Sequence, residues 1–162
     1  MNNRLLDGQS FNAQYQGKIF IKLTNQKENH NKYQFKTGLN IDSLPFNPEG
    51  ECQPGGIYFC LLEDLSLWLH YNDQIMFYVR FVTIPADAQV WLETNKFKTN
   101  QLILGDRTKI TDLEVWNDSS YWLTIVQKNG LALQYVKEKT PEICLAAVQQ
   151  NSCAWEYVPE IC

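Results

Sequence analysis

The stretch IMFYVRFVTI, residues 75–84, is the clearest structural signal in the chain. Apolar residues occupy both alternating sets of positions, as expected for a strand whose two faces are both covered. Pro85 follows directly and ends the strand, because proline cannot donate a hydrogen bond to the ladder. The stretch therefore predicts a central strand of a sheet, with Arg80 as a charge in an otherwise apolar setting.

Shorter apolar stretches on both sides predict the rest of this sheet. We expect strands at residues 18–23, 57–60, 90–93 and 102–104. Residues 95–100 would connect the last two of these strands, and residues 62–71 have the apolar spacing of a helix. Residues 38–56 are rich in Gly, Pro, Asn and Asp, which predicts an ordered but irregular loop.

The end of the chain repeats itself. NGLALQYV at residues 129–136 aligns with NSCAWEYV at residues 151–158, an offset of 22 residues. Between the two copies, Thr140 is a suitable N-cap, with Pro141 at the first helical position and Glu142 in the first turn. A short fixed period of this kind is typical of stacked helical repeats.

These patterns predict an α+β protein with two parts. Residues 1–126 would form a mostly antiparallel sheet with one or two packed helices, and residues 127–162 a short helical-repeat appendage. A repeat cannot bury its apolar face alone, so the appendage must dock on a neighbour.

Composition and charge exclude several classes of protein. The 162 residues are 44% hydrophobic and 20% charged, which excludes a disordered chain. No apolar run reaches the roughly 18 residues that a membrane span needs, and the first residues lack the apolar run of a signal peptide. Five cysteines, an odd number, are typical of reduced thiols rather than of a secreted disulfide framework. We expect a soluble intracellular protein without a membrane partner.

The charge is uneven along the chain. Residues 1–40 carry six cations and two acids, whereas residues 41–162 carry eight cations and sixteen acids. Nucleic-acid binding depends on a concentrated basic surface. The basic excess here is thin and interleaved with Asn and Gln, so we expect no nucleic-acid partner.

Two segments carry the residues that a binding site would use. CQPGGIYFC, residues 52–60, is either a ligand-binding turn, with Cys52 as a nucleophile or metal ligand beside Gly55 and Gly56, or a tight turn with cysteines that pack as small hydrophobes. The second interpretation is favoured, because a reactive thiol needs an electropositive setting and the nearby charges are acidic. Arg80 either binds an anion or pairs with an acid such as Asp64 or Asp87.

The spacing of the cysteines does not predict a metal centre. Zinc sites commonly use close pairs such as Cys-x2-Cys, whereas the spacings here are Cys-x7-Cys and Cys-x8-Cys. We expect neither a metal nor a cofactor.

Several blocks resemble proteins of giant amoeba-infecting DNA viruses of the mimivirus kind. NGLALQYVKEKTPEICLAAV and the residues after it, about 127–162, resemble short helical repeats of unknown function that are abundant in these viruses. FKTGLN (35–40), CQPGGIYF (52–59), VRFVTIP (79–85) and NKFK (95–98) resemble a domain that precedes ankyrin repeats in such proteins. The resemblance implies a viral source and names no reaction. It implies the cytoplasm of the infected host cell, with the virus factory or the virion as alternatives.

The sequence favours a non-catalytic interaction or structural module over an enzyme. Trp155 and Tyr157 would leave an apolar face at the end of the last repeat, for a protein partner or for self-association into a dimer or larger species. The enzyme alternative is a small-ligand or ADP-ribosyltransferase-like domain, which the order of elements faintly resembles. That alternative requires a pocket lined by Arg80 or by the Cys52–Gly56 turn.

Overall fold

The computed structural model describes residues 4–30, 32–49, 53–71, 74–114 and 118–160. The chain divides into two compact units. Residues 1–65 and 77–107 form the sheet unit, and residues 66–76 and 108–162 form the helical unit. The α+β class is confirmed, because helices occur beside a sheet whose neighbouring strands are antiparallel along the described path from β1 (Leu5–Asp7) to β5 (Gly38–Ile41). The predicted boundary between residues 126 and 127 stays a prediction.

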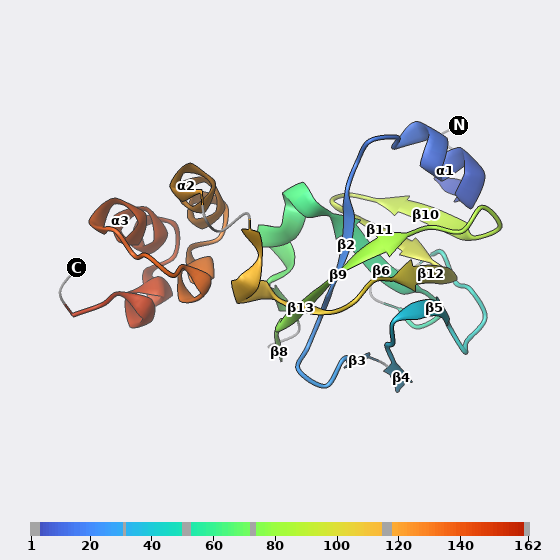
Figure 1. The fold of residues 1–162 in the computed structure, drawn as a ribbon, viewed down its shortest axis with the longest axis horizontal. Helices are drawn as coiled ribbons and strands as arrows, with labels where there is room; N and C mark the ends of the chain where they lie inside the picture. The colour runs from blue at the N-terminus through green and yellow to red at the C-terminus, as the bar shows by residue number, and fades with distance from the viewer. Residues whose placement is uncertain (1–3, 31, 50–52, 72–73, 115–117, 161–162) are drawn as a thin grey trace. The chain divides into compact units, whose positions relative to one another are not determined.

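One open path of antiparallel strands runs through the sheet unit (Figure 1). Its order is β1 (Leu5–Asp7), β10 (Gln89–Glu93), β11 (Lys96–Thr99), β6 (Ile57–Leu61), β2 (Phe20–Thr24), β9 (Tyr78–Thr83), β12 (Gln101–Leu104) and β5 (Gly38–Ile41). The unit also contains α1 (Gly8–Gln14) and a small hairpin of β3 (Asn29–His30) and β4 (Tyr33–Gln34).

The predicted central strand is confirmed, with a later start. β9 lies between β2 and β12, so both of its edges are paired. The backbone N–H of Met76 donates to Leu69 O at 3.0 Å, whereas the N–H of Phe77 donates to Thr24 O at 2.8 Å. Because the hydrogen-bond partner changes between these two residues, the predicted strand is divided into β8 (Gln74–Ile75) and β9.

Three predicted segments differ from the structure. The expected connection at residues 95–100 contains β11, and the expected loop at 38–56 begins with β5. The expected helix at 62–71 is a 3₁₀ helix, η1 (Leu62–Trp68), followed by β7 (His70–Tyr71). The polar residues around Phe97 resemble a connection, but β11 pairs with β10 and with β6, and all of its residues are buried.

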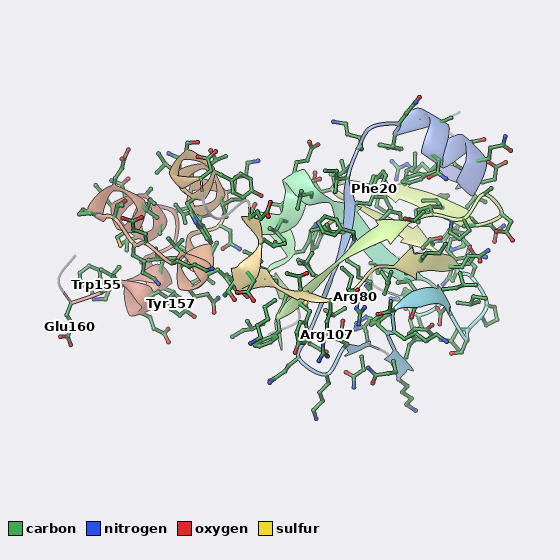
Figure 2. All side chains as sticks on the ribbon, in the orientation of Figure 1. Phe20, Arg80, Arg107, Trp155, Tyr157 and Glu160 are labelled. Atoms are coloured by element: carbon green, nitrogen blue, oxygen red, sulfur yellow. The ribbon has the colours of Figure 1, made fainter. Side chains whose placement is uncertain are left out.

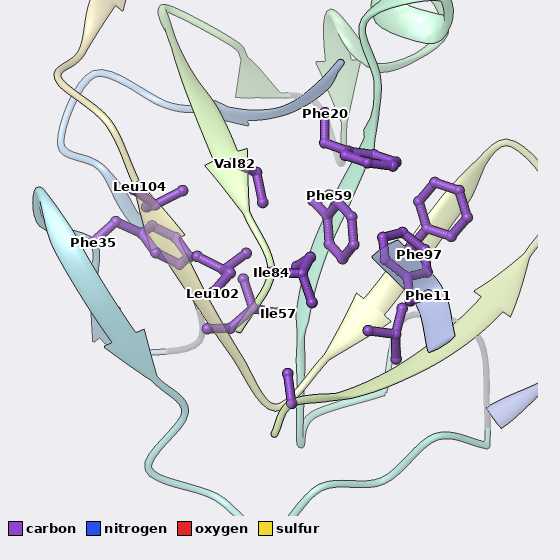
Figure 3. Packing of buried hydrophobic residues seen from close by; sticks show 12 residues of the cluster. Phe11, Phe20, Phe35, Ile57, Phe59, Val82, Ile84, Phe97, Leu102 and Leu104 are labelled. Carbon is purple, nitrogen blue, oxygen red and sulfur yellow. The ribbon is translucent and has the colours of Figure 1, made fainter. Parts of the chain in front are cut away.

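The core of the sheet unit is rich in aromatic rings (Figure 3). Phe11 of α1 lies 5.1 Å from Phe20, 5.8 Å from Phe59 and 5.2 Å from Phe97, measured between ring centroids. Phe59 and Phe97 are opposite each other in the β6–β11 register. Packed aromatic pairs of this kind contribute about 0.5–1.5 kcal/mol each beyond their buried area. They hold the short helix α1 on strands from distant parts of the chain.

The helical unit contains two consecutive pairs of helices. The first pair is α2 (Ser119–Lys128) and η4 (Gly130–Tyr135), and the second is α3 (Pro141–Gln150) and η5 (Ser152–Tyr157). The unit also contains β7, β8, β13 (Thr108–Lys109) and η2 (Ile110–Asp112). None of the described helices is long and apolar enough to cross a membrane.

The caps of α3 agree with the sequence prediction. Thr140 is the N-cap, and its side chain accepts a hydrogen bond from the Ile143 N–H at 3.3 Å. Pro141 occupies the first turn together with Glu142. The Thr140 side chain thus satisfies one backbone N–H that would otherwise be unpaired at the start of the helix. The repeat segment at residues 129–136 contains a helix, as expected for helical repeats, but it is a 3₁₀ helix, η4.

Candidate functional site

Arg80 extends from the centre of β9 into a buried ion pair. Its Nε donates to Glu28 Oε2 and its Nη2 to Glu28 Oε1, both at 2.8 Å. Its Nη1 donates to Thr37 Oγ1 at 2.8 Å and to Gly105 O at 2.7 Å. The side chains of Arg80 and Glu28 are only 6% and 4% exposed. Every nitrogen of the guanidinium therefore donates to a group of the same unit. Figure 2 labels Arg80 in this unit.

Glu28 is positioned by a tight turn after β2. Its φ is +52°, a left-handed conformation that non-glycine residues seldom adopt. Its carboxylate also accepts from Thr24 Oγ1 at 2.8 Å, and Arg107 Nη1 lies 3.6 Å from Oε1. Burial alone would raise the pKa of Glu28, but the hydrogen bonds from Arg80 and Thr24 and the positive charges of Arg80 and Arg107 together outweigh burial and lower it. The pair therefore holds the polar segment after β2 against the sheet.

This geometry favours the structural interpretation of Arg80. The predicted partners, Asp64 and Asp87, are wrong, because the carboxylate comes from Glu28. Glu28 lies in a polar stretch that resembles a surface loop, and nothing in its spacing predicts a partner 52 residues away. The enzyme alternative requires Arg80 in the wall of a pocket, and an arginine that is ion-paired and buried gives that alternative no support.

The Gly55–Gly56 turn packs on a buried lysine. Gly55 and Gly56 have φ values of +98° and +151°, as the paired glycines predict. A Cβ at Gly56 would lie 2.7 Å from the Lys98 side chain. Lys98 is fully buried, and its Nζ donates to Asn47 O at 2.6 Å and to Gln53 O at 3.0 Å.

These contacts describe a structural turn, in which an ammonium group holds the backbone of the loop. Cys52 lies outside the described residues, so its predicted role as a nucleophile or ligand stays a prediction. Sequence reasoning missed Lys98 because a KFK triplet is typical of an exposed connection. Its alternation with Phe97, within a run that includes Thr99, was the available signal for a strand.

Lys22 is a further buried cation of the sheet unit. It lies opposite Arg80 in the β2–β9 register, and its Nζ donates to Tyr58 O at 2.6 Å. The same ammonium lies 4.6 Å from the centroid of the Phe35 ring. Burial lowers the pKa of Lys22 to about 8. None of these contacts is with a carboxylate. Burial of the charged ammonium therefore reduces the stability of the folded protein.

Cys60 lacks the features of a reactive or metal-binding cysteine. Burial raises the pKa of the Cys60 thiol to about 12, which disfavours the thiolate that nucleophilic or metal chemistry needs. Cys144 is also buried, whereas Cys153 is exposed. Within the described ranges, no cluster of three or more His, Cys, Asp or Glu side chains could hold a metal ion.

The two helix pairs of the helical unit correspond at the same offset as the sequence repeat. Each boundary of α2 and η4 recurs 22 residues later in α3 and η5. Asn129 and Asn151 play matching roles: each ends an α-helix, and each side chain accepts from the N–H two residues later. We call residues 119–136 the first repeat and residues 141–158 the second repeat.

The first repeat is covered by neighbours of the helical unit. Asn129 Nδ2 donates to Ser66 O at 2.8 Å, and Tyr135 OH donates to Met76 O at 2.8 Å. The second repeat also packs against it: the Gly130 N–H donates to Gln150 Oε1 at 2.6 Å. Burial accordingly raises the pKa of Tyr135 above its usual range.

Corresponding positions of the second repeat are more exposed. Leu133 is fully buried, whereas its counterpart Trp155 is 70% exposed. Leu123 is half-buried, whereas its counterpart Leu145 is 60% exposed. Figure 2 shows Trp155 and Tyr157 on η5; Tyr157 is half-buried, and its counterpart Tyr135 is buried. We call the exposed residues Leu145, Cys153 and Trp155 of the second repeat the open face.

Comparisons with known proteins agree with the viral resemblance. A family model described as "Domain of unknown function (DUF4116)" matches residues 118–161, a range that contains both repeats. The chain is 35% identical over 105 residues to "Uncharacterized protein R869" of Acanthamoeba polyphaga mimivirus, a match that covers 61% of this chain and 73% of that protein.

Two longer relatives from the same virus are putative ankyrin repeat proteins. One, R868, is 29% identical over 106 residues, and the other, R229, is 30% identical over 115 residues. Each match covers 61% of this chain, but only 51% and 36% of the respective relatives. This chain thus spans about half or less of these ankyrin repeat proteins. No solved structure matches the chain.

Proposed function

Since this chain belongs to the same protein family as the uncharacterized mimivirus protein R869, we propose that it is a non-catalytic protein-interaction module of a giant virus. The open face of the helical unit would contact the partner. The sheet unit would serve as a stable body, because its most unusual charged groups, Arg80 and Glu28, satisfy one another.

The exposure of Trp155 is the observation that carries this proposal. An exposed tryptophan is unusual at a position whose counterpart, Leu133, is fully buried. Exposed Leu145 adds a second large apolar side chain from the neighbouring helix. Tryptophan is over-represented among the residues that contribute most to protein–protein binding, and exposed apolar surface of this kind often marks an interaction site.

The relatives support the same class of function. Two of them are named as putative ankyrin repeat proteins, and arrays of such repeats present extended binding surfaces to other proteins. A domain shared with such proteins is well placed to assist protein recognition. We expect this chain to act in the cytoplasm of the infected host cell.

Site-directed cross-linking at Cys153 tests the proposal. Cys153 is the exposed cysteine of the open face, whereas Cys60 and Cys144 are buried. A variant with Cys52→Ser and Cys162→Ser would carry a photoactivatable maleimide at Cys153. We expect discrete cross-links in extracts of infected amoebae, or between copies of the purified protein, and their loss in Trp155→Ser.

A matched control is Ile41→Ser. Ile41 is an apolar residue of the sheet unit that is 56% exposed, and its substitution should leave the cross-links intact. If Cys153 gave no discrete cross-link, or gave cross-links that Trp155→Ser did not weaken, the open face would not be an interaction surface.

A further inference from the structure

We infer that the open face binds a cationic, amphipathic segment of a partner protein rather than a further repeat or a second copy of this chain. This inference rests on the proposed function and names the chemistry of the partner. Two independent features carry it: the residue at position 152, and the charges around Trp155.

Position 152 blocks the addition of another repeat in the same register. In the first repeat the corresponding residue is Gly130, which lies against the end of α3. A Cβ at Gly130 would lie 2.2 Å from Ala147 O and 3.1 Å from Asn151 N. Glycine is therefore required where the second repeat packs on the first.

The second repeat has Ser152 at this position. If another repeat packed on the second as the second packs on the first, the Cβ of Ser152 would overlap backbone atoms of the incoming helix. Backbone cannot move away as the end of a flexible side chain can. A partner of the open face must therefore approach with different geometry.

The charges of the second repeat indicate the sign of the charge on the partner segment. Residues 140–160 contain three glutamates, Glu142, Glu156 and Glu160, and no lysine, arginine or histidine. All three glutamates are exposed. Glu142 lies one helical turn before Leu145, and Glu156 follows Trp155 directly. Within residues 140–160 the charged neighbours of Leu145 and Trp155 are therefore carboxylates, which favours lysines and arginines around the partner's apolar anchor.

The same charges disfavour a second copy. In a two-fold dimer through this face, the same patch of both subunits meets, so the three glutamates of one copy would approach those of the other. Like charges brought together across an interface weaken binding. A cationic partner avoids this repulsion, and its lysines or arginines can also contact the exposed indole of Trp155 through cation–π interactions.

Binding of three labelled peptides of equal length tests the inference. One is an amphipathic Leu/Lys helix, the second has Glu in place of Lys, and the third has Ser in place of Leu. Fluorescence anisotropy would be measured with the full chain at about 0.05 and about 0.3 M NaCl, because screening weakens surface charge interactions. We expect the Leu/Lys peptide to bind at least roughly tenfold more tightly than either of the others.

Three variants separate the contributions of the face. Trp155→Ser should weaken binding of the Leu/Lys peptide at both salt concentrations. Glu142→Gln/Glu156→Gln/Glu160→Gln should weaken it mainly at low salt. Glu49→Gln/Glu63→Gln/Asp87→Asn changes the net charge equally but alters exposed acids of the sheet unit, and it should leave binding unchanged. Circular dichroism and thermal melting would verify that each variant is folded.

The outcomes distinguish this inference from the proposed function. Equal affinity for the Leu/Lys and Leu/Glu peptides, or equal loss in both triple variants, would overturn the cationic partner. So would tight binding of the Ser/Lys peptide that Trp155→Ser does not affect. Cross-links at Cys153 between copies of the chain would also overturn it, while the open face would still be an interaction surface.

Discussion

Arg80 and Glu28, 52 residues apart, form a buried two-point ion pair in which Nε and Nη2 each lie 2.8 Å from a carboxylate oxygen. β9 supplies the arginine, and a turn after β2 supplies the glutamate with a φ of +52°. Replacing such a pair with apolar residues can be neutral, whereas removing one partner leaves a buried charge uncompensated. The pair therefore makes the segment after β2 dependent on the sheet.

Glu28→Gln should destabilise the protein strongly. Breaking a buried pair by removing one partner typically costs about 3–5 kcal/mol in the free energy of unfolding. Urea denaturation would measure the loss, with Glu49→Gln as a control, because Glu49 is exposed. A loss below about 1 kcal/mol, in the range of a surface ion pair, would show that the pair is not important for stability.

The same carboxylate predicts acid sensitivity. The pKa of Glu28 is lowered in the folded protein, so the unfolded chain binds a proton at higher pH than the folded chain does. Its contribution to stability is therefore complete above the unfolded value of about 4.3, and it is lost as the pH falls toward the lower folded value. The stability difference between the natural chain and Glu28→Gln should shrink below about pH 4.3. A difference that is constant with pH would contradict this assignment.

The buried Lys22 predicts a change in stability at alkaline pH. Its pKa falls from 10.5 to about 8 on folding, so between these values the unfolded chain binds more protons and stability rises with pH. Relative to Lys22→Met, the natural chain should gain up to about 3 kcal/mol between pH 7 and pH 10.5.

Cysteines and tyrosines titrate in both proteins over this range. Their effects on the free energy of unfolding cancel when the two proteins are compared at the same pH. Denaturation curves at matched pH values would measure the gain. If the two curves ran parallel over this range, the ammonium of Lys22 would not be desolvated in the folded protein.

Gly130 and Ser152 predict an asymmetry between the repeats. Gly130→Ser would place a Cβ 2.2 Å from Ala147 O, so the second repeat would have to shift. Overpacking of this kind typically costs about 1–3 kcal/mol. Ser152→Ala alters an exposed residue and should change stability by no more than about 0.5 kcal/mol. Thermal melting of both variants tests the asymmetry, and equal effects would remove the steric argument for position 152.

The contacts of Lys98 predict that this side chain protects the loop before β6 from proteolysis. Lys98→Met removes the donor that contacts Asn47 O and Gln53 O. We expect faster cleavage within residues 42–56 in limited proteolysis, detected by mass spectrometry, because loops that lose their contacts open locally. Lys36→Met, at an exposed position, is the matched control. Identical digestion of both variants would show that other contacts hold the loop.

Local pattern was sufficient where the relevant interactions are local. The two-faced apolar stretch predicted β9 as a central strand, and Thr140 with Pro141 predicted the start of α3, because caps and proline act on the adjacent backbone. The offset of 22 residues predicted a repeat whose element boundaries recur at that offset.

The tertiary structure decided what depends on distant partners. β11 is a strand because Phe97 meets Phe59 across the sheet, although its letters are typical of a connection. Glu28 could not be identified as the partner of Arg80, because a long-range ion pair has no spacing rule. By itself, the sequence determined the α+β class and the repeat, and it pointed to Trp155 as an exposed aromatic residue, whereas Tyr157 is half-buried. Only the packed chain decided which charges are buried and which repeat face is left open, because burial depends on contacts between residues far apart in the chain.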